Sequence, residues 1–230
     1  MADDIDTLPR GAGAWGQAVA AVVLTAVLGV GLWTLGETAS SGSATPRPAT
    51  CSGAEAEKAA GRVSGAQLCE ALHRPDLAAL LGTPGEIAKT AGGGAGTFRP
   101  VGGKEIVTPS AEVEFETYTV TLKATYDRLP VAGSAAYLGD GARQRTVLGR
   151  PAVLYWDRTL SISFRLDGSD ATSGPGVPVC ALSVARDAKD SGGSFEVVLW
   201  RADGAVPDDA VLLRVAEKVL PTIPGWNASG

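Results

Sequence analysis

Apolar and polar residues alternate through the middle of the chain, from residue 111 to residue 126. The odd positions from Ala111 to Phe115 are apolar and alternate with glutamates, and after Thr117 the apolar phase moves to even positions, beginning at Tyr118. Such alternation is typical of strands in an antiparallel sheet with one face in the core and the other in water. Because no glycine or proline stands near Thr117, the phase shift predicts a bulge within one long strand.

Helix signals flank these strands. Ser64 and Gln67 match a capping box at the start of a first helix, and a last helix begins at Pro207, followed by two aspartates that suit the positive end of the helix dipole. The glycine-rich segment 90–97 is predicted to be a loop. Further strands are predicted at 152–156, 160–166, 179–185 and 195–199. The predicted fold class is α+β, an antiparallel meander of about five strands packed against an N-terminal and a C-terminal helix and preceded by one transmembrane helix.

A long uncharged run precedes the folded part. No charged residue occurs in the 26 positions between Arg10 and Glu37, and residues 15–35 form an apolar stretch of 21 residues, which is long enough to cross a bilayer as a helix. Trp15 and Trp33 suit the two membrane interfaces. The run is longer than the apolar region of a signal peptide, which favours an uncleaved signal anchor, although the small residues after it leave cleavage open.

The prediction therefore divides the chain into segments. A short cytoplasmic tail at 1–14 is followed by the anchor at 15–35, a flexible Ser/Ala/Pro-rich linker at 36–63, an extracytoplasmic α+β domain at 64–226 and a tail at 227–230. The Lys and Arg residues on the two sides of the anchor do not support this orientation. It rests on the size of the domain and on a cysteine pair that suits an oxidising compartment. The expected location is the cell membrane, in a single pass.

The chain has three cysteines. Cys51 and Cys69 are separated by 17 residues, and a bridge between them would tie the linker to the first helix and stabilise the fold by about 3 kcal/mol. Cys180 shares its strand phase with apolar neighbours and is expected in the core. Pairing of Cys69 with Cys180, or no bridge at all, remains open. The three cysteines and His73 together also match the Cys3His ligand set of structural zinc sites. Such sites usually contain cysteines close together in sequence, and these cysteines are far apart.

Composition excludes several functions. The net charge of −5 argues against nucleic acid as a partner. The single histidine lies in the first predicted helix and no GxSxG motif occurs, so serine hydrolase chemistry is not expected. No catalytic residue and no cofactor is predicted. Five aspartates could gather at one end of the sheet, where a hard cation such as calcium would suit them, but turns and helix capping already account for most of these residues. They are Asp167, Asp170, Asp203, Asp208 and Asp209.

A candidate binding surface lies between residues 129 and 158. Arginines and aromatic residues are mixed there, which is the composition of many binding surfaces and also that of an ordinary solvated loop. The residues are Tyr137, Arg143, Arg145, Arg150, Tyr155, Trp156 and Arg158.

Residues 51–226 resemble a known group of proteins. The segments that carry the likeness are LCEALHRPDLAALLGTPGE, LGRPAVLYWDRTLSISFRLDG, GGSFEVVLWRADGAVPDD and VAEKVLP. They resemble a family of actinobacterial, streptomycete-type, single-span membrane-anchored proteins whose extracytoplasmic domain has no known function. The order of elements is also similar to that of small cell-envelope lipoprotein domains, although the lipobox is absent. The resemblance implies an extracytoplasmic domain and supplies no active residues.

Three hypotheses for the function follow. The first hypothesis is a non-catalytic, membrane-tethered module that binds an unknown protein or ligand of the cell envelope. The alternatives are a hydrolase that uses carboxylates alone on envelope carbohydrate, since paired acids need no histidine, and a structural assembly partner. Two buried carboxyl groups about 5–10 Å apart across a deep pocket would favour the enzyme.

Overall fold

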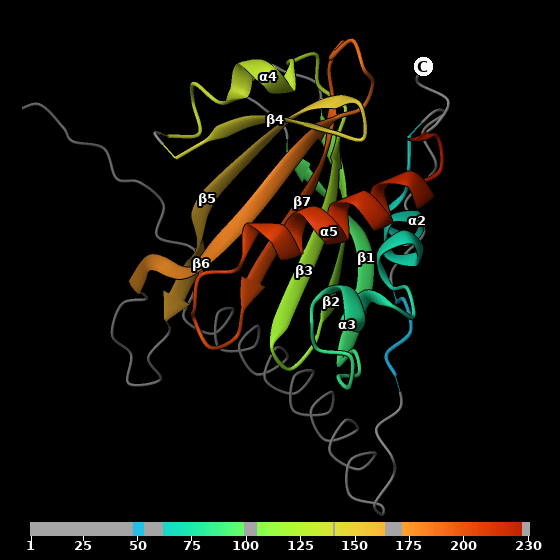
Figure 1. The fold of residues 1–230 in the computed structure, drawn as a ribbon, viewed down its shortest axis with the longest axis vertical. Helices are drawn as coiled ribbons and strands as arrows, with labels where there is room; N and C mark the ends of the chain where they lie inside the picture. The colour runs from blue at the N-terminus through green and yellow to red at the C-terminus, as the bar shows by residue number, and fades with distance from the viewer. Residues whose placement is uncertain (1–47, 53–61, 99–104, 140, 164–171, 227–230) are drawn as a thin grey trace, which may run out of the picture. The chain divides into compact units, whose positions relative to one another are not determined.

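The computed structural model describes residues 48–52, 62–98, 105–139, 141–163 and 172–226 (Figure 1). The predicted anchor at 15–35 and most of the predicted linker lie outside these residues. Among the described residues, no helix has the length and apolar character needed to cross a membrane.

Seven strands form one antiparallel sheet in the order β1-β2-β3-β7-β6-β5-β4. The last strand in sequence, β7, lies between β3 and β6, and the chain crosses from β3 to the far edge before it returns. The sheet is therefore not a simple meander. The strands are β1 (Thr90–Phe98), β2 (Ile106–Glu114), β3 (Tyr118–Thr125), β4 (Arg143–Val147), β5 (Arg150–Ser163), β6 (Thr172–Ala185) and β7 (Ser194–Arg201).

Short helices complete the fold. One face of the sheet packs against α2 (Gly65–Leu72), which contacts β1 and β2, and against α5 (Asp209–Val219), which contacts β6 and β7. On the opposite face, α4 (Val131–Ser134) packs its Val131 against Val153 and Ala185. Two other short elements are α3 (Leu77–Leu80) and the 3-10 turn η1 (Leu220–Thr222).

The predicted fold class is wrong. The structure is a seven-stranded antiparallel sheet with few helices, in place of an α+β sandwich built on a meander of about five strands. Two strands were missed because their sequences lack the apolar alternation of half-buried strands: β1 is rich in glycine, and four of the five β4 side chains are exposed.

The predicted bulge near Thr117 is a hairpin instead. Glu114 pairs with Thr119 across β2 and β3, and the Phe115 N–H donates to the carbonyl of Tyr118. The turn contains neither glycine nor proline, but the carboxylate of Glu86 accepts hydrogen bonds from the backbone N–H and the hydroxyl of Thr117. A residue distant in sequence thus fixes the turn, which explains why the local sequence did not reveal it.

The predicted loop at 90–97 is strand β1. Its glycines allow α2 to lie directly on the strand backbone: a Cβ atom added at Gly93 would come within 2.1 Å of the Gly65 carbonyl oxygen, and one at Gly65 within 2.2 Å of Gly94. The predicted capping box at the start of α2 is confirmed, since the Ser64 hydroxyl accepts from the Gln67 N–H and the Gln67 side chain accepts from the Ser64 N–H.

The core lies between the sheet and the α2–α5 side. Leu68 of α2, Leu122 of β3, Leu182 of β6 and Leu212 of α5 are fully buried there. Arg74, which follows α2, links this helix to α5 by donating to the Lys218 carbonyl at 2.6 Å. Ala152 and Leu154 of β5 belong to this core, whereas the later residues of β5 extend past it.

Candidate binding surface

Strands β5 and β6 extend beyond the body of the sheet. Each has 14 residues, whereas β7 has eight and pairs with β6 only over residues 179–185. Residues 158–163 and 172–178 therefore form a two-stranded projection, which we call the β5–β6 arm (Figure 1). The separate strands predicted at 152–156 and 160–166 are one continuous strand over the described residues, with an irregular register between Arg158 and Leu160.

The arm exposes apolar side chains. Trp156 and Arg158 occupy alternate positions of β5 before the irregularity, and Leu160 and Ile162 occupy alternate positions after it, so the members of each pair share a face. Leu160 is 72% exposed and Ile162 is 52% exposed. Contiguous exposed apolar surface of this kind is typical of interaction sites. The sequence pattern of these two residues is that of a core strand, and only the length of β5 relative to β7 shows that they lie outside the core.

Arginines surround Trp156. The Arg143 guanidinium lies over the Trp156 ring, 5.1 Å from its centroid, which is cation–π geometry. Arg145 lies two positions further along β4, on the same face, and Arg158 Nη1 donates to the Gly176 carbonyl at 3.0 Å. Within the described residues, none of these three arginines forms an ion pair with a carboxylate. We call Arg143, Arg145, Trp156 and Arg158 the arginine–tryptophan surface.

An open hollow of about 540 Å³ adjoins this surface. Gly176 is needed where β6 passes β5, because an added Cβ would meet Thr159 Oγ1 at 2.2 Å, and that oxygen accepts from the Val177 N–H at 3.0 Å. The hollow is thus built on a backbone irregularity that a specific glycine permits. Its lining residues are Trp156, Asp157, Arg158, Thr159, Leu160, Gly174 and Pro175.

Three other residues of the predicted surface lie elsewhere. Arg150 is 8% exposed; it donates to the carbonyls of Arg186 and Trp226, and its guanidinium stacks on the Trp226 ring. Burial lowers the pKa of Arg150. Tyr155 points to the opposite face of β5, where it packs near Val179. Tyr137 is 90% exposed and follows α4.

The Tyr155 hydroxyl donates to the carboxylate of Glu196. Burial, with a further contribution from the negative charge of Glu196, raises the pKa of Tyr155 far above its ordinary value. This tyrosine is therefore a neutral hydrogen-bond donor within the sheet.

The aspartates of the predicted acidic edge have separate structural roles. Asp203 forms an ion pair with Arg201, and this hydrogen-bonded contact lowers the pKa of Asp203 to about 2. Asp208 accepts from the Ala210 N–H and caps α5, with Asp209 in the first helical turn. Asp167 and Asp170 lie outside the described residues, among which no group of acidic, histidine or cysteine side chains could hold a metal ion.

Glutamates that could serve the carboxylate chemistry of a hydrolase are engaged in the scaffold. Glu86 holds the β2–β3 turn, Glu112 accepts from the Thr121 hydroxyl, and Glu196 accepts from Tyr155 and pairs with Lys123. These contacts give each carboxylate a structural partner across or beside the sheet.

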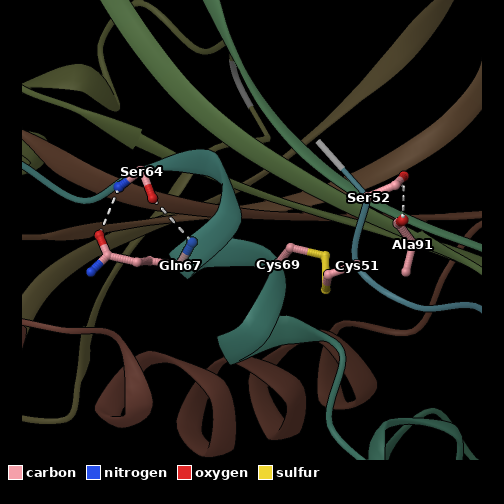
Figure 2. Close-up of a disulfide and its surroundings, with 6 residues drawn as sticks. All are labelled: Cys51, Ser52, Ser64, Gln67, Cys69 and Ala91. Carbon is pink, nitrogen blue, oxygen red and sulfur yellow. Dashed lines mark hydrogen bonds between the residues drawn. A yellow bond between two sulfur atoms is a disulfide. The ribbon is translucent and has the colours of Figure 1, made fainter. Parts of the chain in front are cut away.

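Cys51 and Cys69 form a disulfide, as the sequence predicts (Figure 2). Next to it, the chain runs parallel to β1: the Ser52 N–H donates to the Ala91 carbonyl, and the Gly93 N–H donates to the Ser52 carbonyl. The bond therefore fastens the incoming segment to α2 and to an edge of the sheet. Cys180 is free and fully buried, and burial raises its pKa to about 12. The disulfide removes two of the three thiolates that the zinc hypothesis requires.

Comparison with known proteins identifies the family. No curated protein and no solved structure matches the chain. A family model matches residues 9–141, more than half of the chain, and so includes the strands from β1 to β3 but not those from β4 to β7. The chain belongs to DUF6215, a family of unknown function.

Proposed function

We propose that the chain is a membrane-tethered, extracytoplasmic binding module of the cell envelope, without bond-making chemistry of its own. Its partner would bind to the arginine–tryptophan surface and the adjoining β5–β6 arm. The observation that carries the proposal is the clustering of Arg143, Trp156 and Arg158 with the exposed Leu160, beside an open hollow. Arginine and tryptophan are enriched among the residues that dominate binding energy.

Two further observations support the tether and the compartment. The apolar run at 15–35 has the length of a membrane span, and structural disulfides persist in oxidising compartments such as the cell exterior. The disulfide lies where a tether would meet the domain. Cys51 is bonded to α2 there, and Ser52 pairs with β1.

Site-specific photo-crosslinking in intact cells tests the proposal. A photoreactive amino acid is placed at Leu160 on the arm, and in a matched variant at Glu217, an exposed position on α5. We expect a discrete crosslinked product from position 160 and none from 217, and we expect Trp156→Ala to reduce the product from position 160. Equal products from both positions, or none from either, would contradict the proposal.

A further inference from the structure

Strand β4 ends the sheet with an open edge. Val147 pairs with Arg150 across a two-residue turn, Leu148 and Gly149, both of which have positive φ. In such a hairpin the residue pair next to the turn is hydrogen-bonded, and non-hydrogen-bonded and hydrogen-bonded pairs alternate along the two strands from there. The N–H and C=O groups of Thr146 and Gln144 therefore point away from β5. Pro151 stands opposite Thr146, which agrees with this phase, because a proline has no N–H to donate.

The side chains along this edge are basic. Arg143 and Arg145 share one face of β4, and both are exposed except where Arg143 meets Trp156. The edge also borders an open hollow of about 450 Å³, which includes Gln144, Arg145 and Thr146 in its lining. Two like charges at alternate positions, without a carboxylate partner among the described residues, are electrostatically complementary to acids at the same spacing.

The opposite edge of the sheet shows how this fold accepts an added strand. There the chain's own segment around Ser52 pairs with β1 through backbone hydrogen bonds of 3.1 and 2.8 Å. The described residues contain no such segment beside β4. Arginines on an edge strand disfavour pairing with the equally basic β4 of a second copy, and the same charges favour an acidic partner.

We propose that β4 binds an extended acidic segment of a partner protein as an added strand of the sheet. The backbone groups of Gln144 and Thr146 supply the hydrogen bonds, and carboxylates at alternate positions of the segment face Arg143 and Arg145. This inference rests on the proposed function, because it names the chemistry of the partner that binds beside the arginine–tryptophan surface.

The test uses the full chain in detergent micelles and a short synthetic peptide in which glutamate alternates with threonine. Binding is measured by fluorescence anisotropy of the labelled peptide. A matched peptide with glutamine in place of glutamate removes the charges, and an N-methylated glutamate peptide removes backbone donors without altering the protein. We expect each change to weaken binding about tenfold or more.

Variants of the protein test the same contacts. Arg143→Gln combined with Arg145→Gln removes the charges, and Thr146→Pro removes an outward N–H without removing a bond to β5. Both are expected to weaken binding of the acidic peptide about tenfold. The control is Lys89→Gln, which removes an exposed basic residue just before β1 at the opposite edge. It should leave the affinity within about twofold of the unmodified chain.

Several outcomes would overturn the inference. Equal binding of the N-methylated peptide, together with unchanged binding by the Thr146→Pro variant, would exclude strand addition. Binding to vesicles that contain anionic lipid, with no binding of the acidic peptide, would show a lipid-binding surface instead. If position 160 gives a crosslink in the chain that retains its arginines, and the arginine variants bind the acidic peptide normally, this inference fails and the proposed function stands. If position 160 gives no crosslink in the chain that retains its arginines, the proposed function itself fails.

Discussion

Arginines close together in the sequence have opposite roles in this protein. Arg145 is exposed on β4, whereas Arg150 is buried at the start of β5 and holds two backbone carbonyls and the Trp226 ring. A buried arginine that satisfies carbonyls supports the fold, because its loss leaves those acceptors without partners. The sequence shows two similar residues, and only the packing of the C-terminal segment separates them.

Substitution of these arginines should separate the two roles. We expect Arg150→Ala to lower the free energy of unfolding by about 2–4 kcal/mol, since the buried Trp226 carbonyl and the partly buried Arg186 carbonyl lose their donor. Arg145→Ala should change it by less than about 0.5 kcal/mol. Urea denaturation followed by tryptophan fluorescence measures both values. Similar small losses for the two variants would show that Arg150 is not a core residue.

The buried thiol of Cys180 gives a pH dependence with a definite sign. Burial raises its pKa from 9.0 to about 12, so the folded protein holds this proton more tightly than the unfolded chain does. The contribution to stability is complete below about pH 9 and is lost as the pH rises towards 12. Tyr155, whose pKa is also raised, acts in the same direction.

We therefore expect the free energy of unfolding to fall as the pH rises above 9, and to fall less steeply in a Cys180→Ala variant. Denaturation curves at a series of pH values provide the measurement. A parallel decline in the two proteins would mean that the Cys180 thiol contributes nothing to this dependence.

At the scale of elements, the contact between α2 and β1 depends on glycine. Gly93 and Gly65 bring the helix backbone against the strand backbone, whereas a Cβ at Gly94 would meet no atom within 4 Å. Adjacent glycines in one strand thus differ in what they permit. The helix is fastened here by the disulfide and by its cap, so it cannot move away without cost.

Alanine at each position tests this contact. Gly93→Ala should lower the free energy of unfolding by about 1–3 kcal/mol, because the added methyl group forces two backbones apart. Gly94→Ala should be neutral within about 0.5 kcal/mol. Thermal unfolding by circular dichroism compares the two variants. Equal effects would mean that α2 does not pack on β1 at this point.

Sequence patterns predicted those elements whose signals are local. The α2 capping box, the acidic first turn of the last helix and the strand phase that buries Cys180 are set by neighbours in sequence and are present in the structure, although α5 begins at Asp209 and not at Pro207. Local sequence patterns did not predict the elements that depend on contacts between residues distant in sequence. Glu86 fixes the β2–β3 turn, α2 requires the glycines of β1, and β4 is a strand only because it pairs with β5.

The candidate surface was predictable only in part. Composition indicated Arg143, Trp156 and Arg158, which the structure brings together. Composition also indicated Arg150 and Tyr155, which lie away from this surface. Burial and the direction of a side chain depend on the partner strands, which composition does not show. Leu160 and Ile162 were missed, since their alternation is that of a core strand.

At the scale of the whole molecule, the disulfide joins the segment at Cys51 to α2 through Cys69. It closes a loop between positions 18 apart in sequence, which in the chain-entropy treatment stabilises the fold by about 3 kcal/mol. We expect Cys69→Ala to lower the free energy of unfolding by about 2–4 kcal/mol and to leave Cys51 reactive. Cys180→Ala, the matched control, should cost about 1 kcal/mol. Equal losses would show that the bond does not stabilise the fold.

The central claim is that a binding surface around Trp156 faces the outside of the cell. Its most direct test is labelling of a Leu160→Cys variant in intact cells with a membrane-impermeant maleimide. The unmodified chain is the control, because its cysteines are either bridged or buried. We predict that the variant is labelled before lysis as fully as after it, while the control is not labelled. Labelling of the variant only after lysis would place the surface inside the cell and contradict the account.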